Sequence, residues 1–434
     1  MVEPITLEEV EKIEEKKKAK KKGQRKQEEN KVDIVEEALK AKGFNFVFNE
    51  LSREIEIMSE DGKSEPMTDY IFAGILVELW RSGYNISKPF LETVIMGSMS
   101  EPYHPIADYF DSLPAWKGYD EIAKLAGMVE IKDLPGLNLK TKWPEYLKKW
   151  LVAAAAQATI KEASNHACLV LIGEQGKGKT TFLEYLCPPE LSHLSFTGHI
   201  RIGDKDTDNL LAERFIINID DQLDNMGDLK KLKSMFTVNK VVNRKAYAKF
   251  QPTRPRVASF VASVNSEEFL TDDANRRYLA FTINDINLDG LKSIDQSQLW
   301  AQVAHLLKNG FRYWFSKEEN VIISNTNEAF RVKTEEEEML SIYFSSDPNG
   351  EPWQQTEILN FLASRTNSKL NAKKLTTALK KLGFEKKSAR GVGGREYPVY
   401  VYMVSKIEDY DQERNRKDLK KQLAGSDNEP WPPK

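Results

Sequence analysis

The sequence predicts an α/β fold, and three features of the chain predict it. The apolar run at residues 167–172 is too short for a helix, so it indicates a buried strand, and a glycine-rich turn follows it at once. Helical periodicity resumes at residues 180–186, which completes a strand, loop and helix unit. Two further apolar runs, at residues 214–219 and 257–264, end in polar side chains. This arrangement is typical of the phosphate-binding-loop class of α/β proteins.

The glycine-rich turn has the composition of a nucleotide-binding loop. Gly173, Gly176 and Gly178 would let backbone N–H groups turn inward around phosphate oxygens, which larger side chains would obstruct. Lys179 would reach the β and γ phosphates, and the Thr180 hydroxyl would bind Mg²⁺. We therefore expect ATP and Mg²⁺ as ligands, held by Gly173, Glu174, Gln175, Gly176, Lys177, Gly178, Lys179, Thr180 and Thr181. The alternative is a glycine-rich turn that binds no ligand.

An acidic pair closes the second apolar run. We expect Asp220 to hold the magnesium ion, directly or through water, and Asp221 to orient or deprotonate the attacking water. Such a pair can also be a solvated turn, and the upstream glycine-rich loop is what favours the catalytic interpretation.

The third apolar run ends at Asn265, where AAA+ and related ATPases place a polar residue that positions the attacking water. Farther along, Arg276 and Arg277 offer two guanidiniums, one of which could reach the γ-phosphate of a neighbouring subunit. Adjacent side chains point apart, so we expect only one of them to act. An asparagine that closes a strand and a surface salt-bridge pair are the alternatives for these residues.

Composition places the chain among soluble, cytoplasmic proteins. Its 434 residues are 40% hydrophobic and 30% charged, the N-terminus has no signal-peptide core, and no run is long enough for a membrane helix. Cys168 and Cys187 cannot form a disulfide framework or a four-thiolate zinc site. The net charge of −3 does not decide for or against nucleic acid, because clustering of positive charge matters more.

Composition shifts divide the chain into five parts. We expect a charged tail at residues 1–30, a mostly helical accessory region at 31–149 and an ATPase domain at 150–315, whose first helix spans residues 150–163. The tail is a solvated segment or frayed helix, with a nucleic-acid-binding arm as the alternative. A small hairpin is expected at residues 45–58. Residues 335–405 predict helices followed by a basic hairpin with glycines at 391–394, as in a winged helix, and residues 406–434 a polar tail.

The order of these motifs resembles the virulence-associated protein E family, whose ATPase is related to the superfamily 3 helicases of viruses, phages and plasmids. Residues 105–118 resemble its lead-in, and residues 173–181 its phosphate-binding loop. Asp220 and Asp221 stand where the family more often has an Asp-Glu pair. Residues 239–256 resemble the segment before the family's sensor strand, and the Ser263-Val-Asn265, Phe269-Leu-Thr-Asp272 and Asn275-Arg-Arg277 motifs are similar to family signatures.

The resemblance implies a ring, commonly hexameric, with ATP between subunits and DNA through the centre. It also implies a primase, which family members often carry ahead of this module and which we expect here as a separate partner if it is present at all. Residues 229–256 hold nine cations and no acid, so they are a candidate DNA-binding segment, with Lys240, Arg244, Lys245 and Lys249 as contacts. Phe236, Tyr247 and Phe250 could stack on bases or belong to the core. Some of these cations could instead serve ATP in a neighbouring subunit.

Three function classes follow from these features. The leading one is an ATP-dependent DNA helicase or translocase in phage, plasmid or mobile-element replication. The second is a nucleotide-gated replication initiator or helicase loader that binds DNA without unwinding it. A small-molecule kinase uses the same loop, but the basic segment and the paired arginines after Asn265 disfavour it.

Overall fold

The computed structural model describes residues 31–59, 62, 64–223, 229–242, 253–271, 276–389 and 398–407. The chain forms two compact units, which divide at Phe330 and Arg331. Both charged tails, residues 1–30 and 408–434, lie outside the described residues. Among the helices that are described, none is both long and apolar enough to span a bilayer.

The N-terminal part of the first unit mixes helices and strands. Residues 31–41 are helical, and strands β1 (Phe46–Asn49), β2 (Glu54–Met58), β3 (Ser64–Pro66) and β4 (Ser100–Tyr103) form a sheet of order β3-β2-β1-β4. Helices α2 (Asp69–Arg81) and α3 (Lys88–Val94) and the π-helical turn η1 (Ile95–Met99) separate β3 from β4. The alternating stretch at residues 45–58 thus forms β1 and β2, and this region holds more strand than its pattern predicts.

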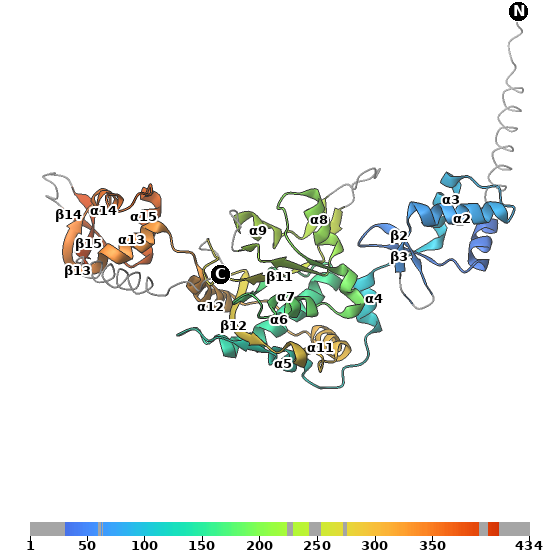
Figure 1. The fold of residues 1–434 in the computed structure, drawn as a ribbon, viewed down its shortest axis with the longest axis horizontal. Coiled ribbons are helices and arrows are strands. Elements are labelled where there is room, and N and C mark those ends of the chain that lie inside the picture. The colour runs from blue at the N-terminus through green and yellow to red at the C-terminus, as the bar shows by residue number, and fades with distance from the viewer. Residues whose placement is uncertain are drawn as a thin grey trace, which may run out of the picture. The chain divides into compact units, whose positions relative to one another are not determined.

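The core of the first unit is a six-stranded sheet of order β5-β12-β6-β11-β8-β7 (Figure 1). Its strands are β5 (Val129–Ile131), β6 (Cys168–Ile172), β7 (Ser195–Thr197), β8 (Ile216–Asp220), β11 (Ser259–Val264) and β12 (Tyr278–Ile286). Neighbouring strands run parallel except β5, which is antiparallel to β12. The predicted α/β class is therefore confirmed. Every side chain of β6 is buried, as a central strand covered on both faces requires.

Helices cover both faces of this sheet (Figure 1). Phe236 at the end of α9 (Leu229–Met235) packs against Phe260 and Tyr278, whereas Trp143 and Tyr146 of α6 (Leu139–Thr159) pack against Phe281. Because Tyr278 and Phe281 are three residues apart on β12, their side chains lie on opposite faces. The remaining helices of the core are α4 (Pro105–Ser112), α5 (Glu121–Ala126), α7 (Lys179–Tyr185), α8 (Lys205–Glu213), α10 (Leu288–Leu291), α11 (Gln296–Lys308) and α12 (Lys317–Asn327), with 3₁₀ turns η2 (Pro189–Leu194) and η4 (Glu328–Phe330).

Helix α6 (Leu139–Thr159) differs from the expected helix at residues 150–163. It begins before Pro144, which lies inside the helix and cannot donate a main-chain hydrogen bond to the carbonyl oxygen of Lys140. Its alanine-rich half is buried, with Ala154, Ala155 and Ala156 fully covered. Both β5 and the first half of α6 therefore pack with the sheet although they precede residue 150.

In the described residues of the second unit, three helices pack with an antiparallel sheet of order β13-β15-β14. Its elements follow in the order α13 (Glu335–Tyr343), β13 (Phe344–Trp353), α14 (Gln355–Ala363), α15 (Ala372–Lys381), β14 (Lys386–Ala389) and β15 (Val399–Lys406). They enclose a small core of their own that includes Leu340, Ile358, Leu375 and Val404. The glycines at 391–394 lie outside the described residues.

Candidate nucleotide site and its neighbours

The glycine-rich loop connects the buried end of β6 to the start of α7. Gly176 and Gly178 have φ angles of +85° and +78°, in the left-handed region that glycine tolerates best. A Cβ at Gly178 would also lie 2.9 Å from Cδ1 of Leu288, so a larger residue would require the Leu288 side chain to shift in addition to the backbone strain. The loop backbone is thereby kept free of side chains where an anion would approach it.

Lys179 lies at the first position of α7 and points back into the loop. Its side chain is buried, and Nζ donates hydrogen bonds to the carbonyl oxygens of Gly173 (2.7 Å) and Glu174 (2.9 Å). It also donates to Oδ1 of Asn265, 3.0 Å away at the end of β11. The structure thus brings together two residues that the sequence assigned to one site from positions 86 apart.

Asp220 collects two hydroxyl groups at the end of β8. Its Oδ1 accepts hydrogen bonds from Thr180 Oγ1 at 2.8 Å and from Ser263 Oγ at 2.5 Å. A hydroxyl and a carboxylate are hard oxygen ligands of the kind that Mg²⁺ prefers, and it binds through one or two carboxylates with the rest supplied by water and phosphate. The donor set therefore fits the expected magnesium ion, with Thr180 and Asp220 as its ligands.

Asp221 has an unusual backbone conformation beside this cluster. Its φ is +46°, its N–H donates to the Ser263 carbonyl at 3.2 Å, and its side chain is exposed. Aspartate is among the few residues other than glycine that adopt this region, at a cost of about 1 kcal/mol. Asp221 directly follows the last residue of β8, and the turn leaves its side chain exposed there.

Arg276 and Arg277 lie at the opposite edge of the sheet. The Arg277 carbonyl accepts a 2.7 Å hydrogen bond from the N–H of Cys168, the first residue of β6. The glycine-rich loop follows the last residue of β6, and a strand of this length separates its ends by about 13–17 Å. Neither guanidinium is therefore placed to contact the loop of its own chain.

Comparison with known proteins identifies the family. The model of the Virulence-associated protein E-like domain matches residues 110–332, which is just over half of the chain. The chain belongs to the virulence-associated protein E-like family. The match covers the whole six-stranded sheet and every element that carries the predicted site residues.

Two solved structures resemble this family member across most of its length. The apo C-terminal region of NrS-1 is 11% identical, with 85% of this chain and 98% of that chain covered and a TM-score of 0.49. A structure described as "SCCmec type IV Cch - active helicase" is 12% identical, with 84% and 92% covered and a TM-score of 0.37. No curated protein sequence matches the chain.

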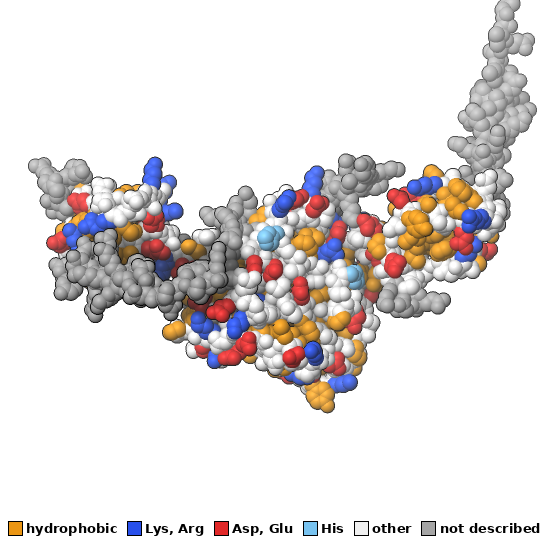
Figure 2. Space-filling view, in the orientation of Figure 1, with side chains coloured by type: hydrophobic (Ala, Val, Ile, Leu, Met, Phe, Trp, Pro, Cys, Tyr) orange, Lys and Arg blue, Asp and Glu red, His pale blue; other side chains and the backbone are white. Residues whose placement is uncertain are grey.

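The basic segment of this family member separates into buried and exposed cations. Lys240 on β9 (Lys240–Val242) is exposed, whereas Arg244, Lys245 and Lys249 lie outside the described residues, as do Tyr247 and Phe250. On the face drawn in Figure 2, basic and acidic side chains are intermixed. Lys240 is therefore the one predicted DNA contact of this segment that is described and exposed.

Two arginines counted among the nine cations of the segment are buried and contact protein groups. Arg254 on β10 (Thr253–Pro255) is buried and bonded to Glu213 Oε1 at 2.8 Å, and Arg256 is almost completely covered. Phe236 is also fully buried, so it belongs to the core and cannot stack on bases. These three side chains hold the sheet and its flanking hairpin together.

Sequence reasoning gave no role to three residues around the loop. Ser263 shares Asp220 Oδ1 with Thr180, and Asp285 Oδ1 lies 4.0 Å from Nζ of Lys177. Leu288 packs against Gly178. The position of Ser263 two residues before Asn265 was a usable signal, because alternate residues of a strand share a face. Asp285 and Leu288 gave no such signal, since their contacts depend on the tertiary fold.

Proposed function

We propose that this protein is an ATP-dependent DNA helicase or translocase that hydrolyses Mg-ATP and acts in the replication of phage, plasmid or mobile-element DNA. The observation that carries the proposal is the convergence of four predicted site residues at one edge of the sheet. Lys179 Nζ lies 3.0 Å from Asn265 Oδ1, and Thr180 Oγ1 lies 2.8 Å from Asp220 Oδ1. Phosphoryl transfer to water needs a glycine-rich loop with a cation, a hydroxyl, a carboxylate and an amide around it, and these four residues supply those groups.

Each group has a distinct task in hydrolysis. The Lys179 ammonium would exchange its bonds to the loop carbonyls for bonds to the β and γ phosphates. Thr180 and Asp220 would hold Mg²⁺, which neutralises charge on the phosphates when bound. Asn265 would position the attacking water, and Asp221 would orient that water or accept its proton. The 3.0 Å contact between Lys179 Nζ and Asn265 Oδ1 supports this assignment, because the lysine that would bind the γ-phosphate lies beside the amide that would position the water.

The same proposal assigns Arg276 and Arg277 to a neighbouring subunit. Because they lie at the sheet edge opposite the loop, an arginine that stabilises the γ-phosphate must come from a second copy of the chain. A closed ring in which each loop edge faces the arginine edge of the next copy meets this need. A hexamer is the ring size that we propose.

DNA contact is proposed for two surfaces. In the first unit, exposed Lys240 begins the basic stretch that continues to Arg244, Lys245 and Lys249. In the second unit, the element order is helix, strand, helix, helix, strand, strand, which is that of a winged helix. Its helix α15 carries Lys373, Lys374, Lys380 and Lys381 and no acid, so we propose that it binds duplex DNA.

The basic helix of the second unit also favours a second candidate function. An initiator or helicase loader would use such a surface to bind an origin and would use ATP only to gate that binding. It would turn over slowly and would not separate strands. A fork-unwinding assay distinguishes the candidates, because only the motor converts hydrolysis into strand separation.

The central test is steady-state ATP hydrolysis with and without single-stranded DNA. Lys179→Ala removes the phosphate-binding cation and is expected to lower kcat by a factor of about 100 or more. Lys205→Ala removes an exposed cation on α8 and serves as the matched control, with unchanged rates expected. Absence of hydrolysis in the wild-type chain, or hydrolysis that Lys179→Ala leaves intact, contradicts the proposal.

A further inference from the structure

A cavity lies at the sheet edge opposite the glycine-rich loop. Its volume is about 340 Å³, and it opens between the end of α6, the residues before β6, the residues before β12 and the segment before α12. The side chains that matter most for its chemistry are His166, Arg276, Arg277, Tyr313, Trp314 and Asn320. These residues come from four separate stretches of sequence, and no motif marked them together as a site.

Two guanidiniums are among the described side chains that line the cavity. Of the described residues that line it, none is an aspartate or glutamate. Neither Arg276 nor Arg277 forms an ion pair with a carboxylate among the residues that the structure describes. The pKa of His166 is lowered by burial and then by the charges of Arg256, Arg277 and Arg276. The cavity therefore favours an anion over a cation or a neutral molecule.

One wall of the cavity is aromatic. Tyr313 and Trp314 pack edge to face with ring centroids 5.4 Å apart, and Trp314 is 57% exposed. A large exposed aromatic beside two guanidiniums offers a flat surface for a base or a sugar next to ligands for phosphate. Inorganic phosphate alone would leave this surface unused.

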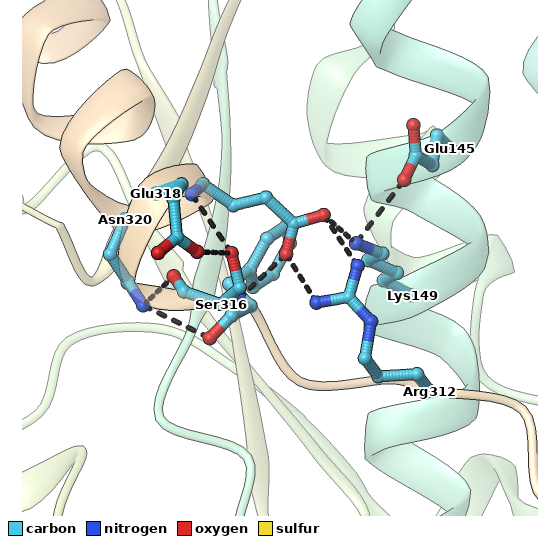
Figure 3. Close-up of polar contacts among 8 residues, drawn as sticks. Glu145, Lys149, Arg312, Ser316, Glu318 and Asn320 are labelled. Carbon is cyan, nitrogen blue, oxygen red and sulfur yellow. Dashed lines mark hydrogen bonds and ion pairs between the residues drawn. The ribbon is translucent and has the colours of Figure 1, made fainter.

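Glu319 holds the segment that carries the aromatic wall, and Figure 3 labels three residues that bond to it, Lys149, Arg312 and Ser316. Arg312 donates two hydrogen bonds to the Glu319 carboxylate, at 2.8 and 2.9 Å, and the N–H of Ser316 donates a third at 2.6 Å. Lys149, a buried residue of α6, also donates to Glu319 and lies 5.0 Å from the ring centroid of Phe315. Both ends of the segment 312–316 are thus tied to one carboxylate.

Asn320 strengthens the same arrangement. Its Nδ2 donates to the carbonyl oxygens of Phe315 at 3.1 Å and Ser316 at 2.7 Å (Figure 3). The wall is therefore held in one conformation before any ligand arrives, which lowers the entropic cost of binding.

We propose that this cavity binds the phosphate-bearing part of a nucleotide, with His166, Arg276 and Arg277 as phosphate ligands and Trp314 against the base or sugar. Glu319 is the positioning residue for the aromatic wall. The inference rests on the proposed function in one respect, since the nucleotide can be one that a second copy holds on its glycine-rich loop. A free nucleotide in solution has the same chemistry, and the experiment separates the two sources.

The first arm measures ATP binding by calorimetry in the Lys179→Ala chain, whose own loop is disabled. Residual ATP binding is expected. Adding both Arg276→Ala and Arg277→Ala should weaken this binding by a factor of about 10 or more, because hydrogen bonds between charged groups are among the strongest in proteins. Lys205→Ala with Lys308→Ala removes the same charge at exposed positions elsewhere and should change nothing. This result identifies free nucleotide as a ligand of the cavity.

The second arm applies if the Lys179→Ala chain alone binds no ATP. The Lys179→Ala chain is then mixed with a chain that carries both Arg276→Ala and Arg277→Ala, and the rate of ATP hydrolysis that the mixture restores is measured. The same mixture is measured again with Trp314→Ala added to the Lys179→Ala chain. A loss of restored hydrolysis of several-fold on removing Trp314 identifies the neighbour's nucleotide as the ligand. If neither arm shows a dependence on the cavity residues, the proposal is wrong, whether or not the wild-type chain hydrolyses ATP.

Two more measurements test which ligand the cavity takes and what Glu319 does. If the arginine variants lose affinity for a single-stranded oligonucleotide and keep their affinity for ATP, the cavity is a DNA site and the proposal is overturned. Glu319→Gln should weaken nucleotide binding at the cavity several-fold and leave binding at the glycine-rich loop unchanged. Equal losses at both sites would reduce Glu319 to a general structural role.

Discussion

The Thr180 hydroxyl donates a 2.8 Å hydrogen bond to Oδ1 of Asp220. The two residues lie on different elements, α7 and β8, so the bond ties the residue after Lys179 to the end of β8. Ser263 on β11 bonds the same oxygen at 2.5 Å. Three elements therefore meet at one carboxylate, and a metal ion bound there would be fixed relative to the whole sheet.

Asp220→Asn should abolish magnesium-dependent hydrolysis while preserving the fold. The amide keeps the size of the carboxylate and can still accept from Thr180, but it loses the negative charge that holds Mg²⁺. We expect kcat to fall by a factor of about 100 or more, whereas nucleotide binding measured in the presence of a chelator changes little. Asp206→Asn, at an exposed position of α8, is the matched control. A variant that hydrolyses ATP normally would remove Asp220 from the metal site.

Mixtures of inactive subunits test the arginine edge. The Lys179→Ala chain keeps its arginines and the Arg277→Ala chain keeps its loop, so an interface between them can combine one intact half from each. Mixtures should therefore hydrolyse ATP faster than either parent, and the gain should depend on total protein concentration. If no mixture hydrolyses ATP faster than either variant alone, catalysis between subunits has no support.

The order of strands along the chain allowed much of the candidate site to be predicted. Lys179, Asp220 and Asn265 each follow or end a strand of the same sheet, and parallel strands place these ends at one edge. The contact of Lys179 with Asn265 is the direct result. The position of Arg277 before β12, at the other edge, follows from the same rule, although the sequence alone did not show which strands were neighbours.

Burial of charged residues could not be predicted in the same way. Arg254 and Arg256 belong to a run of cations, and their sequence neighbours give no reason to separate them from Lys240. Their partners, Glu213 and Gln157, lie 41 and 99 positions away. A cation is buried only where the fold brings acceptors to it, and this information is absent from local composition.

Arg256 is expected to stabilise the fold without contacting DNA. Its guanidinium donates to the carbonyl oxygens of Ala258 (3.0 Å) and Asn165 (2.9 Å) and to Gln157 Oε1 (2.8 Å). Burial lowers its pKa to about 10, which still leaves it charged at neutral pH. Arg256→Met would remove these three buried hydrogen bonds, and we expect the free energy of unfolding to fall by about 2–4 kcal/mol.

Chemical denaturation of the wild-type and Arg256→Met chains measures this loss. DNA affinity, compared at a temperature where both are folded, should be equal. Lys240→Ala provides the contrast, because an exposed cation should affect DNA affinity and not stability. If the Arg256→Met chain is stable but binds DNA weakly, Arg256 is not buried in the complex with DNA and this prediction is wrong.

The Glu319 network should make stability depend on pH in a defined direction. Burial acts to raise the pKa of Glu319, but hydrogen bonds from Arg312 and Lys149 outweigh it and lower the pKa from 4.5 to about 2. A carboxyl whose pKa is lower in the folded chain stabilises the fold above its unfolded pKa, and this contribution is lost as the pH falls toward the folded value. Glu319→Gln should therefore lower the denaturation midpoint at pH 7. The difference between the midpoints of the variant and the wild-type chain should become smaller as the pH falls from 5 toward 3. Glu162→Gln, at an exposed position, should show no such trend. A difference between Glu319→Gln and wild type that stays constant over this range would mean that the charge of Glu319 is not what holds the segment.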